Sequence, residues 1–517
     1  MKLNLRTVFC ISMLFANILN ATSCCSTQNN KSLQTVCAKK GNIFGKTFFS
    51  YRPQDSNVAR RMVGVIDKMS KTYDDGYSLV SLGLQYQETF KRNKLAEFFA
   101  FNKNKSMSYG PTCNEFDIYG INLGTTATGA ICLNPVIKNV IVDVDMCNNW
   151  DFFICGLWSR FTLPFVYSRN ELNLKEACRD FKIPPEPFEK NLVTVDGFTG
   201  KAVPFINLRN AFDITRPFGS APALDFGKIT EKRHDAQIAG LHLELGYDFY
   251  KTEDCFVGAG LHFVAPTGTK PEVQFLFEAV CGANKSGQVG GTFHAGYTMW
   301  QSCSGDQSLA LYFDSIVTHL FASKQRRLFG LFIDGKTSAG SSYLLLKKFD
   351  ASGAIIGLER AANLLAIESK IKANVMADIA LMLQYDTCNV STGLGWNYWS
   401  RSCEIITDDY CNPFKGNDKY GIKGNSLSDN NSTESKSTIG TCSAIETNPV
   451  FLTNKDIDSS LALNPSTFSN KIFGFVGYNW NSCKTVPYVL LQAEVEIGNK
   501  NTAADQWSLL LKTGISF

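Results

Sequence analysis

Two histidines flank a short turn motif near the middle of the chain. His242 and His262 sit almost symmetrically about KTED (residues 251–254), in the runs IAGLHLELGYDFY and CFVGAGLHFVAPTG. If these runs pair as a hairpin, both imidazoles come close together on one face with Glu244. Two imidazoles and a carboxylate could hold a metal, but a site needs a further convergent ligand, and the sequence offers none. Alternatively, the two histidines are hydrated side chains on a polar face. We expect no metal and no cofactor.

Catalytic motifs are not recognisable. The five histidines lie in no nucleophile motif, and triads are defined by geometry rather than by sequence order. The stretch GKTSAGSS has the wrong glycine spacing and context for a phosphate-binding loop. We therefore predict a protein that is not an enzyme.

Charged side chains recur on one face of several alternating runs. Together with the two histidines they form the candidate lumen-lining set: His242, Glu244, Asp248, His262, Lys370, Lys372, Asp378, Glu494, Glu496 and Lys512. Inside a closed sheet, opposed charges set a field that biases which solutes pass. These charged side chains could equally be solvated, or paired with one another, and only fill the lumen. Neither sign dominates, so no ion preference follows.

The elements that must position these residues are strands, because the hydrophobic period is two. YSLVSLGLQYQETF places Val80, Leu82, Leu84 and Tyr86 on one face, and the run SKIKANVMADIALMLQY alternates in the same way. Such runs reach about 10 to 14 residues, longer than the usual globular strand. Aromatic residues gather near their ends, as at Trp300, Tyr385, Trp396, Tyr398, Trp399, Tyr478 and Trp480. Aromatic ends around aliphatic middles are typical of a lipid-facing band.

A sheet in lipid must close on itself, because its backbone groups find no water there. We therefore predict an all-β fold, a transmembrane antiparallel β-barrel of about 12 to 16 strands with long loops. The barrel should cover residues 76–517, with a long insert at 169–235 and a long exposed loop at 402–470. The final strand, WSLLLKTGISF, should pair with the first.

The N-terminus has the pattern of an export signal. Lys2 and Arg6 precede the apolar run VFCISMLFANIL, and small residues follow before an expected cut near Ser23. An uncleaved anchor helix is the alternative, but the run is short for a bilayer span. We assign 1–23 to a signal peptide and 24–75 to a periplasmic lead-in segment, in which a short amphipathic helix is expected around Val58 to Met69.

The amino-acid composition limits the classes of partner that the protein is expected to bind. The net charge is only +4 and charged residues make up 19% of the chain, so no nucleic-acid surface is indicated. The chain has 17 cysteines, without CxxC pairs, and in an exported protein these favour disulfides over metal. Asn-X-Ser/Thr triplets at Asn389 and Asn431 leave open a secreted eukaryotic protein.

At this point the sequence resembles the outer-membrane β-barrel proteins of Gram-negative bacteria, porin-like ones especially. The residues that carry the resemblance are Leu509, Leu511, Ile515 and the final Phe517, which look like the assembly signal of that class. The resemblance implies an outer-membrane location, contact with lipid and with the outer-membrane assembly machinery, and a channel for passive diffusion of small hydrophilic solutes. The alternatives are a surface structural or adhesive protein anchored by a barrel, and a FadL-like transporter of hydrophobic substrates.

The cysteine content departs from ordinary porins. By composition it resembles the cysteine-rich major outer-membrane proteins of some intracellular bacteria. This comparison implies disulfide-linked neighbours or a homo-oligomer as further partners.

Lys512 is expected to face the lumen toward Glu494 or Glu496.

Overall fold

The computed structural model describes residues 43–70, 78–100, 106–110, 116–117, 120–121, 128–180, 217, 219–229, 232–333, 336–408, 410–416, 418–423, 451–480 and 485–517. The expected signal peptide at 1–23, much of the insert at 169–235 and much of the loop at 402–470 lie outside these residues.

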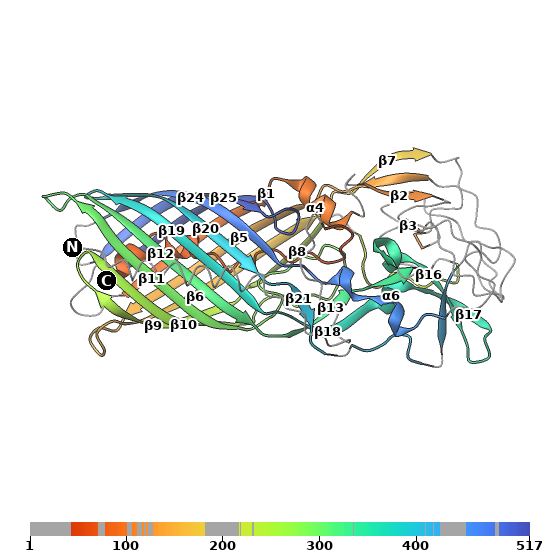
Figure 1. Cartoon of the computed structure of the whole chain (residues 1–517). Coiled ribbons are helices and arrows are strands. Elements are labelled where there is room, and N and C mark those ends of the chain that lie inside the picture. The colour runs from red at the N-terminus through yellow and green to blue at the C-terminus, as the bar shows by residue number, and fades with distance from the viewer. Residues whose placement is uncertain are drawn as a thin grey trace.

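Twelve antiparallel strands form a closed barrel, shown as the long cylinder in Figure 1. They are β1 (Ser78–Thr89), β5 (Val136–Asn149), β6 (Leu157–Glu171), β9 (Leu241–Lys251), β10 (Cys255–Ala265), β11 (Gln288–Gln301), β12 (Ser308–Leu320), β19 (Val375–Asp386), β20 (Val390–Arg401), β24 (Thr467–Asn479), β25 (Val486–Gly498) and β26 (Gln506–Ser516). Each pairs with the next, β8 (Lys232–Ile238) adds to the end of β6, and β26 pairs with β1. The predicted barrel and its closure by the last strand are confirmed.

Side chains alternate between the two faces of this barrel, as the period of two predicts. Along β1, Leu82 and Leu84 are about half exposed, whereas Ser81 and Gln85 are buried. The same outward apolar face continues around the barrel at Leu243, Leu245, Leu261, Phe263, Leu381, Leu383, Leu394, Ile472, Val476, Leu491, Val495, Leu509 and Leu511. Trp399 is an exception to the predicted aromatic ends, because it is fully buried and packs against Met376.

Five glycines on the inner face lie directly opposite an aromatic residue of the neighbouring strand. The pairs are Gly246 with Trp158, Gly296 with Phe256, Gly393 with Phe475, Gly395 with Phe473, and Gly514 with Tyr488. A Cβ atom on Gly246 would lie only 2.1 Å from the indole of Trp158, and one on Gly296 only 2.1 Å from the ring of Phe256. Each ring therefore occupies the space that a side chain would need.

The two ends of the barrel differ. At one end the connections are short, as at 252–254, 302–307 and 387–389, and the C-terminus lies at this end (Figure 1). At the other end lie the described parts of the long connections within 90–135, 172–240, 266–287, 321–374 and 402–466.

The described parts of these connections form small elements that we call the cap. Its helices and strands are α4 (Arg92–Phe99), α6 (Ala361–Leu365), β2 (Ser106–Gly110), β3 (Phe116–Asp117), β4 (Thr128–Cys132), β7 (Lys175–Asp180), β13 (Ser323–Leu328), β14 (Gly330–Ile333), β15 (Lys336–Ser338), β16 (Leu345–Phe349), β17 (Ile355–Arg360), β18 (Ala366–Ala373), β21 (Glu404–Ile406), β22 (Lys419–Ile422) and β23 (Ile457–Asp458), with short 3-10 turns η1 (Ala339–Tyr343), η2 (Asn454–Asp456) and η3 (Ser459–Ala462). Buried residues such as Phe98, Phe329 and Leu345 give the cap a hydrophobic core of its own.

The run SKIKANVMADIALMLQY is two strands rather than one. Its first half is β18, which pairs with β13 and β21 in the cap, and its second half is the barrel strand β19. The chain bends at Asn374, between the two strands, where Val375 and Ser402 exchange hydrogen bonds. Among the described residues, no helix is long and apolar enough to cross a membrane.

Candidate functional site: the occupied lumen

The lumen holds part of the chain itself. Residues 52–68, which we call the plug, run inside the barrel and include α2 (Val58–Met62) and the start of α3 (Ile66–Ser70). Helix α2 contacts β12, β19 and β20 from within. Plug residues from Arg52 to Asp67 are buried almost throughout. Of the predicted lead-in segment, residues 52–68 thus lie against the inner wall of the barrel, whereas Ile43 and Phe49 pack in the hydrophobic core of the cap.

Arg52 makes the first charged contact between plug and wall. Its Nη2 lies 2.7 Å from Asp378 Oδ2, and its Nη1 lies 3.4 Å from Glu496 Oε1. The same Nη1 donates to Asn397 Oδ1 at 2.8 Å. The guanidinium is therefore held by strands β19, β20 and β25 together.

Asp378 also fixes the beginning of α2. Its Oδ2 accepts a hydrogen bond from the Ser56 hydroxyl at 3.2 Å and from the Val58 backbone N–H at 3.1 Å. Its Oδ1 accepts from Asn397 at 2.6 Å. A carboxylate near a helix N-terminus satisfies backbone donors that the helix leaves unpaired. This one wall residue thus binds both the arginine and the helix start.

Two further arginines continue the pattern. Arg60 forms an ion pair with Asp143 and donates to Gln85 Oε1 at 2.6 Å. Arg61 forms an ion pair with Glu244 of β9, two strands along the wall from Asp143 of β5. Four acidic side chains of the wall are therefore paired with arginines of the plug: Asp143, Glu244, Asp378 and Glu496.

The two histidines singled out by the sequence do meet. His262 Nδ1 lies 2.7 Å from Glu244 Oε1, and His242 Nδ1 lies 3.4 Å from His262 Nε2. His242 Nε2 faces Asp55 Oδ2 of the plug at 3.2 Å. In this arrangement Glu244 serves Arg61 and His262, and the described residues contain no group of three or more His, Cys, Asp or Glu that could hold a metal ion.

Lys512 does not contact the predicted partners. Its Nζ lies 3.4 Å from Asp145 Oδ2 and donates to the backbone oxygens of Arg60 and Val63, each at 3.2 Å. The prediction that it faces Glu494 or Glu496 is wrong, because Glu494 lies opposite Ser508 in the strand register while Lys512 lies opposite Leu490.

Lys471, and not Lys512, contacts Glu494 and Glu496. Its Nζ lies 2.9 Å from Glu494 Oε2 and 3.8 Å from Glu496 Oε2. Asp248, the remaining predicted acid, lies 2.7 Å from His294 Nε2.

Lys370 and Lys372 do not line the lumen, and this part of the prediction is wrong. Both lie on β18 in the cap, because the chain leaves the barrel wall at the bend before Val375. Lys370 is exposed, and its backbone N–H donates to Asp408.

The plug arginines were missed by sequence reasoning, although a signal existed. The predicted inward faces carried more carboxylates than lysines once Lys370 and Lys372 are removed. Acids packed inside a protein need cations from somewhere. The segment DSNVARRM, just ahead of the first strand, supplies Arg60 and Arg61.

Apolar residues of the plug alternate in sequence with its ion-paired residues. Val58, Met62, Val63, Val65 and Ile66 pack in one cluster. The wall contributes Phe256, Tyr312, Met382, Phe473, Phe475, Tyr488 and Leu490 to it. Burial of apolar surface of this kind stabilises by about 25 cal/mol per Å². The plug is thus held by charge in one part and by hydrophobic contact in the next.

Of the predicted assembly residues, Leu509, Leu511 and Ile515 are exposed on the outer face of β26, and Phe517, which follows the strand, is exposed as well. At the seam between the last and first strands, Phe517 N donates to Ser78 O and Ser78 N donates to Phe517 O, both at 2.9 Å.

The fold and its outward apolar face define a transmembrane-type β-barrel with an occupied lumen. No protein-family model matches the chain, and no curated protein matches it in sequence. Similar solved structures include an outer membrane channel from Pseudomonas putida F1 (9% identity, 87% of this chain, 98% of that chain, TM-score 0.36) and the Pseudomonas putida toluene transporter TodX (7%, 93%, 99%, 0.30). Another is the translocator domain of the autotransporter NalP from Neisseria meningitidis (6%, 89%, 94%, 0.29). With TM-scores this low, the function proposed below rests on the structure of this chain alone.

Proposed function

We propose that this protein is an outer-membrane β-barrel channel for small hydrophilic solutes, closed in this conformation by the plug. The observation that carries the proposal is the ion-paired contact between plug and wall, centred on Arg52, Arg60 and Arg61. Charged groups that part inside a lumen can exchange their partner for water. The apolar contacts of the plug, around Val63 and Ile66, add to the cost of opening, because their surface would be exposed to water.

The location in an outer membrane is supported by the outer face of the barrel. A closed sheet satisfies all its backbone groups internally, and its exposed aliphatic belt, with Leu82, Leu245 and Leu491 among its members, would be unfavourable in water. In such barrels the short turns face the periplasm and the long loops face outward. We infer that the cap lies on the outside of the cell.

The polar lumen favours a hydrophilic solute over a hydrophobic one. Its wall carries buried Asp143, Asp145, Glu494 and Lys471, each of which would have to be desolvated by an apolar substrate. A FadL-like role is therefore less well supported by the inner wall.

The test is conductance in a planar bilayer. Purified full-length protein should open rarely, and the Arg60→Ala/Arg61→Ala variant should open more often, with discrete steps, because two anchors of the plug are gone. Lys324→Ala/Lys370→Ala, which removes two exposed charges from the cap, is the matched control and should behave as wild type. Folding of every variant is checked by heat-modifiable mobility on a gel.

A second function is supported by the cap. These loops have a hydrophobic core of their own, which includes Phe98, Phe329 and Leu345. They therefore form a folded structure and do not only connect strands. A surface structural or adhesive protein would use the barrel as an anchor and keep its lumen closed. Silence of both the wild type and the Arg60→Ala/Arg61→Ala variant, with the barrel folded, would favour the anchor and contradict the channel.

We further propose contacts with neighbouring copies through thiols. Cys155 and Cys303 are exposed free cysteines in two short turns at the same end of the barrel. Their oxidation would link neighbours in the membrane, and a disulfide ladder on a non-reducing gel that disappears in Cys155→Ser/Cys303→Ser is the expected result. During folding, the exposed residues of β26 would be offered to the outer-membrane assembly machinery.

A further inference from the structure

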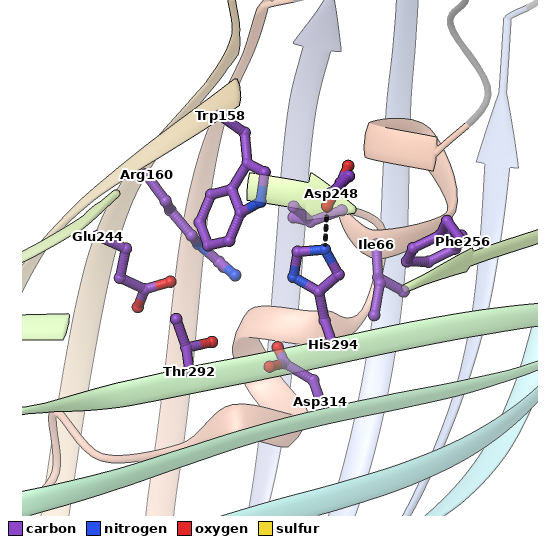
Figure 2. Close-up of a pocket in the computed structure, with 10 residues that line it drawn as sticks. Ile66, Trp158, Arg160, Glu244, Asp248, Phe256, Thr292, His294 and Asp314 are labelled. Atoms are coloured by element: carbon purple, nitrogen blue, oxygen red, sulfur yellow. Dashed lines mark hydrogen bonds and ion pairs between the residues drawn. The ribbon is translucent and has the colours of Figure 1, made fainter. Parts of the chain in front are cut away.

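Charged side chains inside the barrel are largely paired with one another. Asp248 lies 2.7 Å from His294, as the dashed line in Figure 2 marks, and Glu244 pairs with Arg61 of the plug. Charged side chains on the outer face of the strands gather mainly at the end that carries the cap. The outer face at that end is therefore the part of the barrel that could attract a charged partner.

A row of outward side chains crosses neighbouring strands near the cap. Glu88 of β1 lies opposite Lys138 of β5, and Lys138 lies opposite Arg169 of β6. Residues directly opposite each other in antiparallel strands share a face. The side chains of Lys138 and Arg169 are 35% and 37% exposed, so this face is the outer one. Exposed Lys232 of β8 extends the row, opposite Glu171.

The cations of this row outnumber its carboxylates. Lys138 Nζ lies 3.5 Å from Glu88 Oε1, and Arg92 Nη2 lies 3.6 Å from the same oxygen. Arg169 forms an ion pair with Glu171, the residue that also lies opposite Lys232. Two carboxylates thus face four cations, and a net positive charge remains. We call these four cations, Arg92, Lys138, Arg169 and Lys232, the basic row.

The basic row is confined to one arc of the barrel. On the other barrel strands, all of which the structure describes, the outward residues nearest the cap include no lysine or arginine. They are Leu241, Ala265, Val289, His319, Val375, Ser400, Phe468, Ile497 and Trp507. The positive charge therefore belongs to β1, β5, β6 and β8, and it is not a general property of the rim.

The next row toward the middle of the barrel is aromatic and aliphatic. It consists of Tyr86, Val140 and Tyr167, two residues or about 7 Å along the strands from the basic row. The ring of Tyr86 lies 5.5 Å from that of Trp507. Aromatic side chains of this kind mark the membrane interface, and lipid headgroups lie at its outer edge. The basic row is therefore at headgroup level.

We propose that the basic row binds the phosphate of a lipid headgroup in the leaflet on the cap side of the membrane, with Lys138 and Arg169 as its main contacts. An arginine offers paired donors that match phosphate oxygens, and basic side chains at a membrane surface attract anionic lipids. The proposal rests on the membrane location proposed above and is independent of conduction. One bound phosphate would join β5 and β6 from outside.

Free phosphate and an acidic protein segment are the competing occupants. Either would meet the same positive charge. Neither would gain from the aromatic row beneath it, whereas the upper part of a lipid would contact Tyr86 and Tyr167 at the same time. The position of the basic row directly above the lipid-facing belt therefore favours a lipid.

The experiment is titration of the full-length protein in a non-ionic detergent with two lipids that share their tails, dioctanoylphosphatidic acid and dioctanoylphosphatidylcholine. We expect the phosphatidic acid to bind at least about twentyfold more tightly, because each lysine or arginine near an anionic headgroup contributes about fivefold. Lys138→Gln/Arg169→Gln should bring the two affinities close together. Lys138→Arg/Arg169→Lys, which keeps both charges, should retain the preference.

The matched control is Lys324→Gln/Lys370→Gln. These two lysines lie opposite each other on β13 and β18 of the cap, so the variant removes the same charge away from the barrel wall and should keep the preference. Folding of every variant is checked by heat-modifiable mobility.

Two results would overturn the inference: equal binding of the two lipids by the folded wild type, or an unchanged preference in Lys138→Gln/Arg169→Gln. Loss of the preference in the cap control would place the site elsewhere and would also overturn it. Inorganic phosphate and hexaglutamate serve as competitors. Displacement of the phosphatidic acid by either one at equal concentration would assign the basic row to a free anion or to an acidic protein instead.

The membrane location is tested separately, by cell fractionation. A membrane-inserted chain without a lipid preference would contradict only the lipid site. A chain that binds the phosphatidic acid in detergent but is recovered outside membranes would contradict only the location.

Discussion

Replacing Arg52 by Ala tests how firmly the plug is held. The guanidinium would lose its contacts with Asp378 at 2.7 Å, Asn397 at 2.8 Å and Glu496 at 3.4 Å. Removing one member of a buried ion pair costs about 3–5 kcal/mol. We take about 3 kcal/mol, the low end of that range, because Glu496 keeps Lys471 nearby at 3.8 Å and water can enter the vacated space. The closed state should therefore weaken relative to the open one by a factor on the order of 100.

Single-channel recording measures this factor as the ratio of open to closed time. Arg92→Ala is the matched control, because Arg92 forms an exposed ion pair with Glu88 at 3.6 Å, a type of contact that contributes about 0–1 kcal/mol. Asp378→Asn should act in the same direction as Arg52→Ala. The double variant should fall short of the sum of the two single effects, because the residues share one contact. An open-state ratio for Arg52→Ala equal to that of Arg92→Ala, in folded protein, would refute the reasoning.

Deleting Phe517 removes the reciprocal backbone hydrogen bonds with Ser78 and should lower the yield of heat-modifiable barrel. The control Phe517→Leu keeps those bonds and therefore separates their effect from that of the aromatic ring. Full assembly of the deletion variant would contradict a role for these bonds in closing the barrel. Gly246→Ala should lower the denaturant midpoint by the equivalent of about 1–3 kcal/mol, since its Cβ would meet Trp158, whereas Gly291→Ala, whose nearest neighbour is 3.6 Å away, should not. In the cap, burial alone would raise the pKa of Glu404, but Arg327 and Arg401 hold that pKa below its ordinary value of 4.5. This contribution to stability is present above about pH 4.5 and is lost as the pH falls through the lower folded pKa, so protease resistance of the cap should decline in acid, and Glu404→Gln should flatten the decline.

The barrel was predictable because alternation is a local property of the chain. Leu82 and Leu84 face outward in the structure for the same reason that they share a face in the sequence. The meeting of His242 and His262 followed in the same way, from their nearly equal distance to a tight turn, although the register places His242 opposite Val264 and His262 opposite Glu244.

Contacts between distant segments were not predictable. The plug depends on Arg52 meeting Asp378 and Glu496, hundreds of residues away, and no local pattern encodes such a pairing. The prediction that Lys370 lines the lumen was wrong for a different reason. An alternating pattern continues through a bend, so it cannot tell where a strand leaves the barrel wall for the cap.

The inward glycines have one more consequence. Because Trp158 lies over Gly246 and Phe256 over Gly296, these rings fold back along the wall instead of reaching toward the axis. The free bore of the barrel is thus set by residues that have no side chain. The helical plug fits in it because those positions carry no side chain, so adding a single methyl group to the wall should displace a ring and change how the plug is held, although the plug itself is unaltered.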